Sequence, residues 1–263
     1  MQTTLVFDIE TVPDTAGLRT LYELDAELSD ADVAEIAFQR RRAAAGSDFL
    51  PLHLQRVVAI SCVLREGAGL RVWSLGAAGD PESALIQRFF DGIEKYTPQL
   101  VSWNGGGFDL PVLHYRGLLH GAVAPRYWDL GDGDYTDSRD FKWNNYIGRY
   151  HMRHCDLMDV LAMYQPRNNA PLDDLARLAG LPGKLGMDGS QVWSAFRDGR
   201  IAAIRSYCET DVLNTWLLYL RFLLMRGVVE REGYDEEIRL VRGTLGAAPE
   251  PHWAEYLAHW PAE

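Results

Sequence analysis

The chain has few cysteines, no long apolar run and a shortage of basic side chains. Its three cysteines are too few and too widely spaced for a disulfide framework or a zinc site, so we expect a reducing, cytoplasmic environment. The most apolar segment, residues 216–225, is too short to span a bilayer and contains Arg221. Asp8 interrupts the apolar start of the chain, which argues against a signal peptide. No membrane association is expected.

Basic side chains are outnumbered: 26 Lys and Arg stand against 37 Asp and Glu, which leaves a formal net charge of −11. This balance argues against a bulk electrostatic grip on nucleic acid, because neutralising phosphates requires Lys and Arg. Carboxylates that bind divalent cations stop repelling phosphate once the cations are in place. A nucleic-acid substrate is therefore not excluded by charge alone.

Apolar residues make up 47% of the 263 residues, which is typical of a soluble protein with one sizeable core. Hydrophobic patterning and turn residues predict strands at 4–9, 56–64, 70–75 and 99–104. The same criteria predict helices at 18–45, 81–96, 110–121, 171–181 and 200–226, with an irregular, aromatic-rich stretch at 125–155. Strands interleaved with helices favour one α/β domain with a mixed sheet.

Acidic residues interrupt the apolar pattern at three places. In "LVFDIETVPD", Asp8 and Glu10 lie two apart on the first strand, so both side chains leave the same face. In "WNGGGFDLP", Asp109 follows a glycine turn between a strand and a helix. In "SYCETDVLN", Tyr207 and Asp211 lie four apart on the long helix and share a face.

A buried, unpaired carboxylate is costly, so these acids require a cationic partner. Four carboxylates that converge would form an oxygen-rich site suited to Mg²⁺ or Mn²⁺, and no Cys/His set competes for that role. Two such ions about 4 Å apart can activate a water and stabilise the leaving oxygen in phosphodiester hydrolysis. The pattern therefore predicts a site for two divalent cations.

The motifs "FDIET", "NGGGFD" and "YCETD" resemble motifs I, II and III of the DnaQ-like DEDD 3′–5′ exonucleases. The likeness is greatest to the exonuclease domain of family-B DNA polymerases, as found in small stand-alone bacterial proteins. The third motif has Tyr207 and Asp211 separated by three residues, which is the DEDDy pattern, whereas the histidine subtype would need His where Ser206 stands. The resemblance implies an RNase H-like mixed β-sheet flanked by helices.

The resemblance also implies roles for individual residues. Asp8, Glu10, Asp109 and Asp211 correspond to the four metal-binding acids, with Asp8 bridging both ions and Glu10 and Asp211 completing one site. Tyr207 corresponds to the residue that orients the attacking water. It is not expected to act as a free base, because an unperturbed phenol titrates near 10.

The implied activity is hydrolysis of single-stranded DNA from its 3′ end, with release of nucleoside monophosphates. An exoribonuclease or oligoribonuclease of the same superfamily is the alternative, since only contacts to the 2′-hydroxyl would separate the two. A non-catalytic nucleic-acid-binding module would be expected to lack one or more of the acids. All four acids and the tyrosine are present, which disfavours that interpretation.

Three further residues lie near the motifs. Asn104 matches the motif II asparagine near the substrate strand in the family, but it also suits a turn cap. Phe108 is placed either to stack on a base or sugar or to pack in the core. Lys184, in the glycine-rich "LPGKLGM", resembles a lysine placed near the scissile phosphate in some family-B exonuclease domains, or it is an ordinary loop lysine.

Asp156 and Asp159 are two more acids, three apart at an expected helix start. This position favours capping or a contact with the substrate strand over metal ligation. If Asp109 does not bind metal, Asp156 is the replacement candidate.

The stretch 139–154 interleaves basic and aromatic residues, which suits a path for single-stranded nucleic acid, with Lys142 and Trp143 as proposed contacts. The alternative is a loop whose aromatics pack on the core. The run Arg40–Arg42 is expected to be a solvated helix end. The basic and aromatic residues of the stretch 139–154 are Arg139, Phe141, Lys142, Trp143, Tyr146, Arg149, Tyr150 and Arg153.

We expect the exonuclease domain to span residues 1–226, with a helical insertion at about 16–50. Residues 227–263 are expected to form a C-terminal extension that packs on the same domain. The segment after Asp211 is too short for a polymerase domain, so the protein is expected to act alone or to recruit a partner protein of replication or repair.

Overall fold

A five-stranded mixed sheet forms the centre of the computed structural model, which describes residues 2–261. The strand order is β3-β2-β1-β4-β5. β1 is antiparallel to β2, β2 is antiparallel to β3, and the pairs β1–β4 and β4–β5 are parallel. The strands are β1 (Thr4–Pro13), β2 (Gln55–Glu66), β3 (Gly69–Ser74), β4 (Gln99–Ser102) and β5 (His154–Asp156). The expected α/β fold with a mixed sheet flanked by helices is confirmed.

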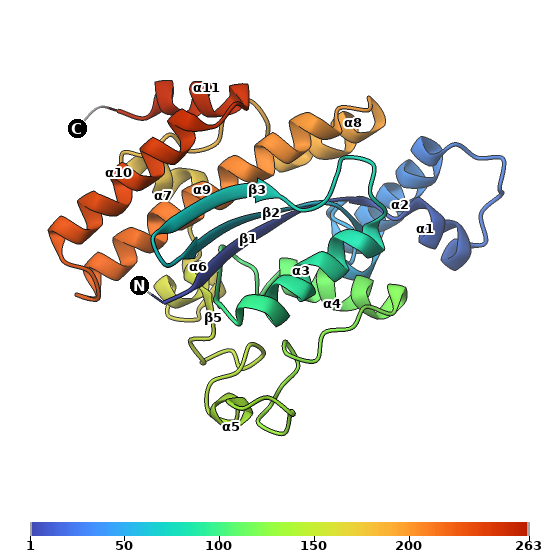
Figure 1. Cartoon of the computed structure of the whole chain (residues 1–263). Coiled ribbons are helices and arrows are strands. Elements are labelled where there is room, and N and C mark those ends of the chain that lie inside the picture. The colour runs from blue at the N-terminus through green and yellow to red at the C-terminus, as the bar shows by residue number, and fades with distance from the viewer. Residues whose placement is uncertain (1, 262–263) are drawn as a thin grey trace.

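Helices cover both faces of this sheet (Figure 1). The long α9 crosses one face, with α10 and α11 outside it, while α3 and α4 lie against the other face. The helices are α1 (Thr15–Tyr22), α2 (Asp30–Ala45), α3 (Glu82–Tyr96), α4 (Asp109–His120), α5 (Ser138–Phe141), α6 (Leu157–Leu161), α7 (Leu172–Leu178), α8 (Val192–Arg197), α9 (Ile201–Met225), α10 (Arg231–Ala247) and α11 (Pro251–His259). Short 3₁₀ turns lie at Leu52–Leu54, Pro166–Asn168 and Gly189–Gln191.

Strand β1 is buried on both faces and separates two hydrophobic cores. Leu5, Phe7 and Ile9 pack in the core beneath α3 and α4, whereas Val6 packs in the core beneath α9. Because side chains alternate along a strand, the acid at position 8 shares the face of Val6 and points toward α9. The first strand thereby places its polar residues on the side of the third motif.

The expected single helix at 18–45 is wrong, because the structure has two helices there. Helix α1 ends at Tyr22, and its C-cap residue Glu23 has a left-handed φ of 51°. Ser29 caps the start of α2 by accepting a hydrogen bond from the Asp32 amide. Both helices pack against a small core of their own, which contains Leu18, Val33, Ala37, Leu50 and Leu54. The insertion is therefore a helical hairpin at the end of β1.

The other predicted elements agree with the structure within a few residues. β4 ends at Ser102, two residues earlier than expected, because the backbone turns at Asn104, which has a φ of 67°. Two short elements, α5 and β5, interrupt the stretch predicted to be irregular. The domain division at residue 226 stays a prediction, and α10 and α11 follow it as helices, with α10 in contact with α9 and β3.

Within residues 2–261, no helix is both long enough and apolar enough to cross a membrane.

Candidate active site

The two acids of β1 lie together beneath α9. Asp8 and Glu10 approach the thiol of Cys208, and one ligand atom from each of these three residues lies within 4.8 Å of the other two. The Cys208 thiol points at Asp8 Oδ2 from 3.5 Å. Glu10 is buried, and the strand pairing shifts directly after it, between Glu10 and Thr11. This bulge interrupts the ladder directly after the acid pair, and pairing resumes from Thr11 to Pro13.

Asp109 joins this pair from the first residue of α4. Its Oδ1 accepts a hydrogen bond of 3.0 Å from the backbone N–H of Ile9, the residue between Asp8 and Glu10. The side chain is 3% exposed. Burial raises the pKa of Asp109 to about 7, although the hydrogen bonds from its own amide and that of Ile9 act in the opposite direction. The carboxylate of motif II therefore contacts the backbone of motif I.

The third motif contributes Tyr207 and Asp211 from one face of α9, both buried. Lys184 lies between them: its ammonium is 2.9 Å from Asp211 Oδ2 and donates a 2.6 Å hydrogen bond to the hydroxyl of Tyr207. Asp211 Oδ1 is buried and has no hydrogen-bond partner among the described residues. One carboxylate oxygen of this helix is thus available for a ligand.

The electrostatics of the site reflect an excess of buried acids. Burial raises the pKa of Asp8 well above its ordinary value, and the charges of Asp109 and Asp211 raise it further. The pKa of Glu10 is raised for the same reason, with burial first and the Asp8 charge next. The pKa of Asp211 is also raised by burial, and Lys184 opposes that shift. One lysine is set against four carboxylates in this cluster.

Lys184 and Tyr207 keep their protons in this environment. Burial alone would lower the pKa of Lys184, but the charge and hydrogen bond of Asp211 outweigh it and raise the pKa. Burial and the nearby carboxylates raise the pKa of the Tyr207 phenol far above its ordinary value. The phenol is therefore a hydrogen-bonding group and not a base at neutral pH.

The glycine turn of motif II is held by Asp156. The carboxylate of Asp156 accepts hydrogen bonds from the backbone amides of Asn104 (3.0 Å) and Gly106 (2.8 Å), and it caps α6 through the Asp159 amide (3.3 Å). A side chain at Gly107 would collide with the Asn104 amide oxygen at 2.4 Å. These contacts support the structural alternative for Asp156, which fixes the turn before Asp109.

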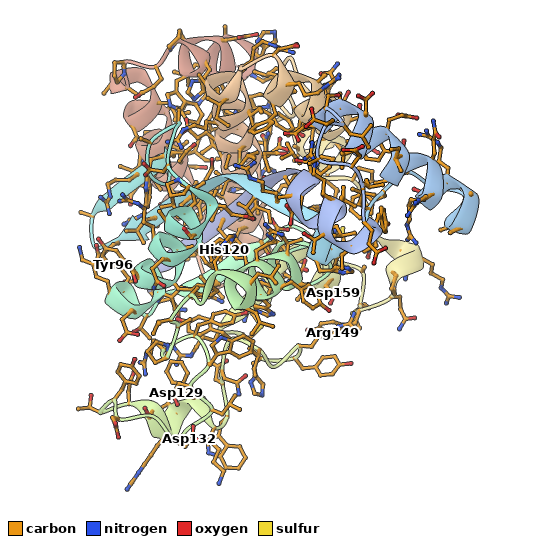
Figure 2. All side chains as sticks on the ribbon, turned by 90° about the vertical axis from the view of Figure 1, so that its right-hand side faces the viewer. Tyr96, His120, Asp129, Asp132, Arg149 and Asp159 are labelled. Carbon is orange, nitrogen blue, oxygen red and sulfur yellow. The ribbon has the colours of Figure 1, made fainter. Side chains whose placement is uncertain are left out.

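Asp159 forms a bidentate ion pair with Arg149, with distances of 2.9 and 3.0 Å (Figure 2). Beside this pair lies a cavity of about 520 Å³, which also includes Asn104, Gly106 and Tyr164 in its wall. None of the four acids of the motifs lines this cavity. It adjoins the motif II turn, immediately before Asp109 in the chain.

Phe108 packs with apolar neighbours on two sides. It is half-buried against the core beneath α3 and α4, which supports the packing alternative for this residue. Its ring also lies 5.8 Å from that of Phe49, a residue after α2 that is 54% exposed. Phe49 is not among the residues predicted near the site, and only its place at the end of the insertion could have indicated it.

Some aromatic residues of the stretch 139–154 pack on the core, and others are exposed as a path for single-stranded nucleic acid would require. Phe141 and Tyr146 are buried, so these aromatics pack on the core. Trp143 and Tyr150 are 76% and 71% exposed, and the Lys142 ammonium lies 5.4 Å from the Trp143 ring. The segment projects below α3 and α4 (Figure 1). Asp129 and Asp132, which precede it in the chain, lie on the same projecting part of the molecule (Figure 2).

Cys208 is a residue of the acid cluster to which the sequence patterns assign no role. Its thiol is buried, and burial together with the Asp8 charge raises its pKa well above the ordinary value. In the sequence, only its position next to Tyr207 in the third motif indicates that Cys208 lies near the acids. The thiol fills the space between β1 and α9 and stays protonated in the absence of metal.

The sequence matches a family described as a predicted 3′–5′ exonuclease related to the exonuclease domain of PolB, over residues 47–260. The chain belongs to this family, and its class is therefore that of the 3′–5′ exonucleases. The matched range begins after the first strand, so it includes motifs II and III but not Asp8 and Glu10.

Two curated relatives are catalytic subunits of DNA polymerase epsilon. The chain is 26% identical over 175 residues to the catalytic polypeptide of DNA polymerase epsilon from Saccharomyces cerevisiae, a match that covers 62% of this chain. It is 25% identical over 147 residues to the corresponding polypeptide of Emericella nidulans, with 54% of this chain covered. The chain spans only 7% and 6% of the lengths of these two relatives.

The fold is similar to that of a family B DNA polymerase from the hyperthermophilic archaeon Pyrobaculum calidifontis. The TM-score is 0.53 at 20% sequence identity, over 85% of this chain and 25% of the polymerase. At this identity the likeness establishes the fold alone.

Proposed function

We propose that this exonuclease hydrolyses single-stranded DNA from the 3′ end, releases nucleoside monophosphates and depends on two divalent cations, Mg²⁺ or Mn²⁺. The observation that supports this most strongly is the meeting of carboxylates from β1, α4 and α9 beside Asp8, with the Lys184 ammonium paired to Asp211. Such a concentration of buried negative charge needs further positive charge to remain ionised.

The side chains present fit hard divalent cations. Asp8 and Glu10 offer carboxylate oxygens beside the thiol of Cys208, whose raised pKa keeps it a neutral and weak ligand. Asp109 adds a carboxylate next to this pair, and Asp211 Oδ1 is a buried oxygen without a partner among the described residues. Carboxylate oxygens suit Mg²⁺ and Mn²⁺. When bound, the ions would supply a water nucleophile at neutral pH and stabilise the charge that develops on the phosphate and leaving oxygens.

Tyr207 and Lys184 act beside these carboxylates. Because its phenol keeps its proton, Tyr207 can donate a hydrogen bond to the attacking water or to a phosphate oxygen. The Lys184 ammonium, held between Tyr207 and Asp211, is placed to neutralise charge on the scissile phosphate. Both groups orient the reactants, and neither removes a proton.

The substrate strand would run from the acid cluster over the motif II turn. Asn104 and the exposed Gly106 and Gly107 border the 520 Å³ cavity, which is large enough for a nucleoside. Beyond it, Trp143 offers an exposed aromatic face with Lys142 beside it, which suits base stacking and phosphate binding. Phe108 packs on the core but is only half-buried, so we include the exposed part of this residue among the proposed contacts near the 3′ end. A partner protein of replication or repair remains part of the proposal.

The decisive experiment incubates the purified protein with 5′-labelled single-stranded DNA or RNA in Mg²⁺, Mn²⁺ or EDTA. We expect DNA to shorten in one-nucleotide steps with either metal and to stay intact in EDTA. Preferential shortening of RNA would favour the exoribonuclease alternative. Activity that persists in EDTA would contradict the role of the carboxylate site.

Trp143→Ala tests the path of the strand. Loss of one stacking contact, about 1–3 kcal/mol, should raise the KM for an oligonucleotide about 5-fold to 160-fold without changing the rate at saturation. Trp73→Ala, on the edge strand β3, is the matched control and should leave the KM unchanged. Equal KM values for Trp143→Ala and the unsubstituted protein would remove the projecting segment from the substrate path.

A further inference from the structure

Helix α11 reaches the active-site lysine through a chain of two buried hydrogen bonds. The Tyr256 hydroxyl donates to Asn214 Oδ1 over 2.6 Å, and Asn214 Nδ2 donates to the carbonyl of Gly183 over 2.9 Å. Tyr256 and Asn214 are fully buried. Burial raises the pKa of Tyr256 well above its ordinary value, so its hydroxyl remains a donor. The chain links α11, α9 and the loop that precedes Lys184.

The bonds act on the peptide group that joins Gly183 to Lys184. Its carbonyl accepts the bond from Asn214, and its N–H donates a 2.6 Å bond to Asp173 Oδ1 from α7. Gly183 has a φ of 73°, and a side chain there would meet Asp173 at 2.4 Å. This peptide plane is therefore held from both sides, which fixes the direction in which the Lys184 side chain leaves the backbone.

A second contact joins α11 to α9 on the other side of Asp211. His252 lies one helical turn before Tyr256, and its Nε2 is 3.0 Å from Glu209 Oε2. Glu209 also accepts a 2.6 Å hydrogen bond from the hydroxyl of Ser74. Helix α11 thus contacts α9 at Glu209 and at Asn214, on either side of the motif III aspartate.

We propose that Tyr256 is a positioning residue for hydrolysis: through Asn214 it holds the Gly183–Lys184 peptide and thereby keeps the Lys184 ammonium between Asp211 and Tyr207. The inference rests on the proposed function in assigning Lys184 a role at the phosphate. It gives the C-terminal helix a task in the active site, although no side chain of α11 belongs to the three motifs. Tyr256 does not touch substrate in this mechanism.

The test is Tyr256→Phe in the full chain, which removes one hydroxyl and keeps the ring. Loss of one buried hydrogen bond should slow single-turnover hydrolysis about 10-fold at saturating DNA, with KM changed less than about 2-fold. The matched control is Tyr219→Phe, because the Tyr219 hydroxyl makes a similar buried bond of 2.7 Å to Gln99, away from Lys184. The control should retain the full rate.

A double-mutant cycle separates positioning from a general effect on folding. In the Lys184→Ala background, Tyr256→Phe should have no further effect on the rate, because its target side chain is gone. Full activity of Tyr256→Phe would overturn the proposal, and so would an equal loss, about 10-fold, in both backgrounds.

Hydrogen exchange of the amides at 183–187 provides a readout that does not depend on activity. We expect Tyr256→Phe to accelerate exchange of the Lys184 amide at least about 5-fold and Tyr219→Phe to leave it unchanged. Unchanged exchange in Tyr256→Phe would overturn the proposal. If exchange accelerates but the unsubstituted protein hydrolyses no DNA, then the proposed function fails while the structural link from Tyr256 to Lys184 stands.

Discussion

The molecule contains two clusters of largely buried ionisable side chains, and they differ in how far positive charge balances negative charge. The site cluster combines four acids with one cation: Asp8, Glu10, Asp109, Asp211 and Lys184. The Arg116 cluster lies between the end of β1, α3 and α4 and consists of Asp14, Glu82, Arg116 and His120. Both are built from strand ends and helices next to β1.

The Arg116 cluster satisfies its own charges. Arg116 donates to both carboxylate oxygens of Glu82, over 2.8 and 2.6 Å, and to Asp14. Glu82 also accepts from the backbone amide of Val57 over 2.7 Å. These bonds tie α3 and α4 to β2 and to the end of β1. Such a closed network holds a fold together but offers no free oxygen to a ligand.

The site cluster differs because its acids repel one another and Asp211 retains an unpartnered oxygen among the described residues. The comparison shows that burial of acids alone does not indicate function. Two features distinguish a ligand site from a structural network: its charges do not balance, and some of its polar atoms lack hydrogen-bond partners. Four changes test this distinction.

The largest effect is expected for Asp8→Asn, which alters the site cluster without disturbing the Arg116 cluster. Hydrolysis should fall at least about 1000-fold, because the charge stabilisation that bound metal supplies is worth several kcal/mol. Folding should persist, and the metal-free protein should be as stable as before or more so, since a repulsive charge is removed. The labelled-DNA assay and urea unfolding measure the two effects. Asp91→Asn, at an exposed position on α3, is the control, and comparable activity of both variants would defeat the assignment.

Glu82→Gln should produce the converse result. It leaves Arg116 buried beside a neutral partner, so the free energy of unfolding should fall by about 3 kcal/mol. The rate of hydrolysis, measured well below the unfolding midpoint, should change little. Glu35→Gln removes a carboxylate from an exposed pair with Arg42 and should cost less than about 0.5 kcal/mol. A loss below about 1 kcal/mol for Glu82→Gln would break the comparison.

The pH dependence of the metal-free protein provides a third test. The pKa of Asp109 is about 7 in the folded protein and about 3.9 in an unfolded chain, so its neutral form favours folding. This contribution is fully present below about pH 4 and is lost as the pH rises from about 4 to 7. In EDTA, the stability of Asp109→Asn relative to the unsubstituted protein should therefore rise by a few kcal/mol between about pH 5 and pH 8.

The difference between the two proteins is the quantity to measure, because buried histidines act in the opposite direction. Burial lowers the pKa of His114 and of His154 to about 4, so their contributions to stability are lost as the pH falls from about 6.5 to 4. These contributions are present in both proteins and cancel. A difference that stays constant with pH would show that the Asp109 carboxylate is not perturbed.

The smallest effect is expected for Tyr207→Phe, which leaves every carboxylate of the site cluster in place. Hydrolysis should slow about 10-fold to 100-fold because the water loses a hydrogen-bond donor. The Mg²⁺ concentration that gives half the maximal rate should not change. An unchanged rate would remove the role of the phenol, and a shifted Mg²⁺ dependence would place Tyr207 in the metal site itself.

The sequence predicts the residues of the three motifs and most elements of the fold. Asp8 and Glu10 stand out because acids are rare in a strand buried on both faces, and this signal is local. The error at 18–45 has a local cause as well: only the left-handed backbone at Glu23 ends the first helix, and Glu is not a residue that marks such a position. Strand β5 escapes prediction because three residues carry no periodicity.

The contacts around Lys184 could not be predicted because they depend on tertiary packing. Asp173, Asn214 and Tyr256 belong to three helices that are separated in the chain, and each is an ordinary residue in its own helix. The same holds for Arg116, whose partners come from the end of β1 and the start of α3. Patterns within one element do not reveal which polar residues of other elements will face it.

The order of the motifs along the chain has a consequence for biosynthesis. Asp8 lies on β1, while Asp211 lies on α9, so the whole segment between them must be translated before the two carboxylates can meet. A nascent chain that has not yet emerged through α9 lacks one of the four acids of the site cluster. The site cluster can therefore form only after α9 has left the ribosome, well after β1 has been translated.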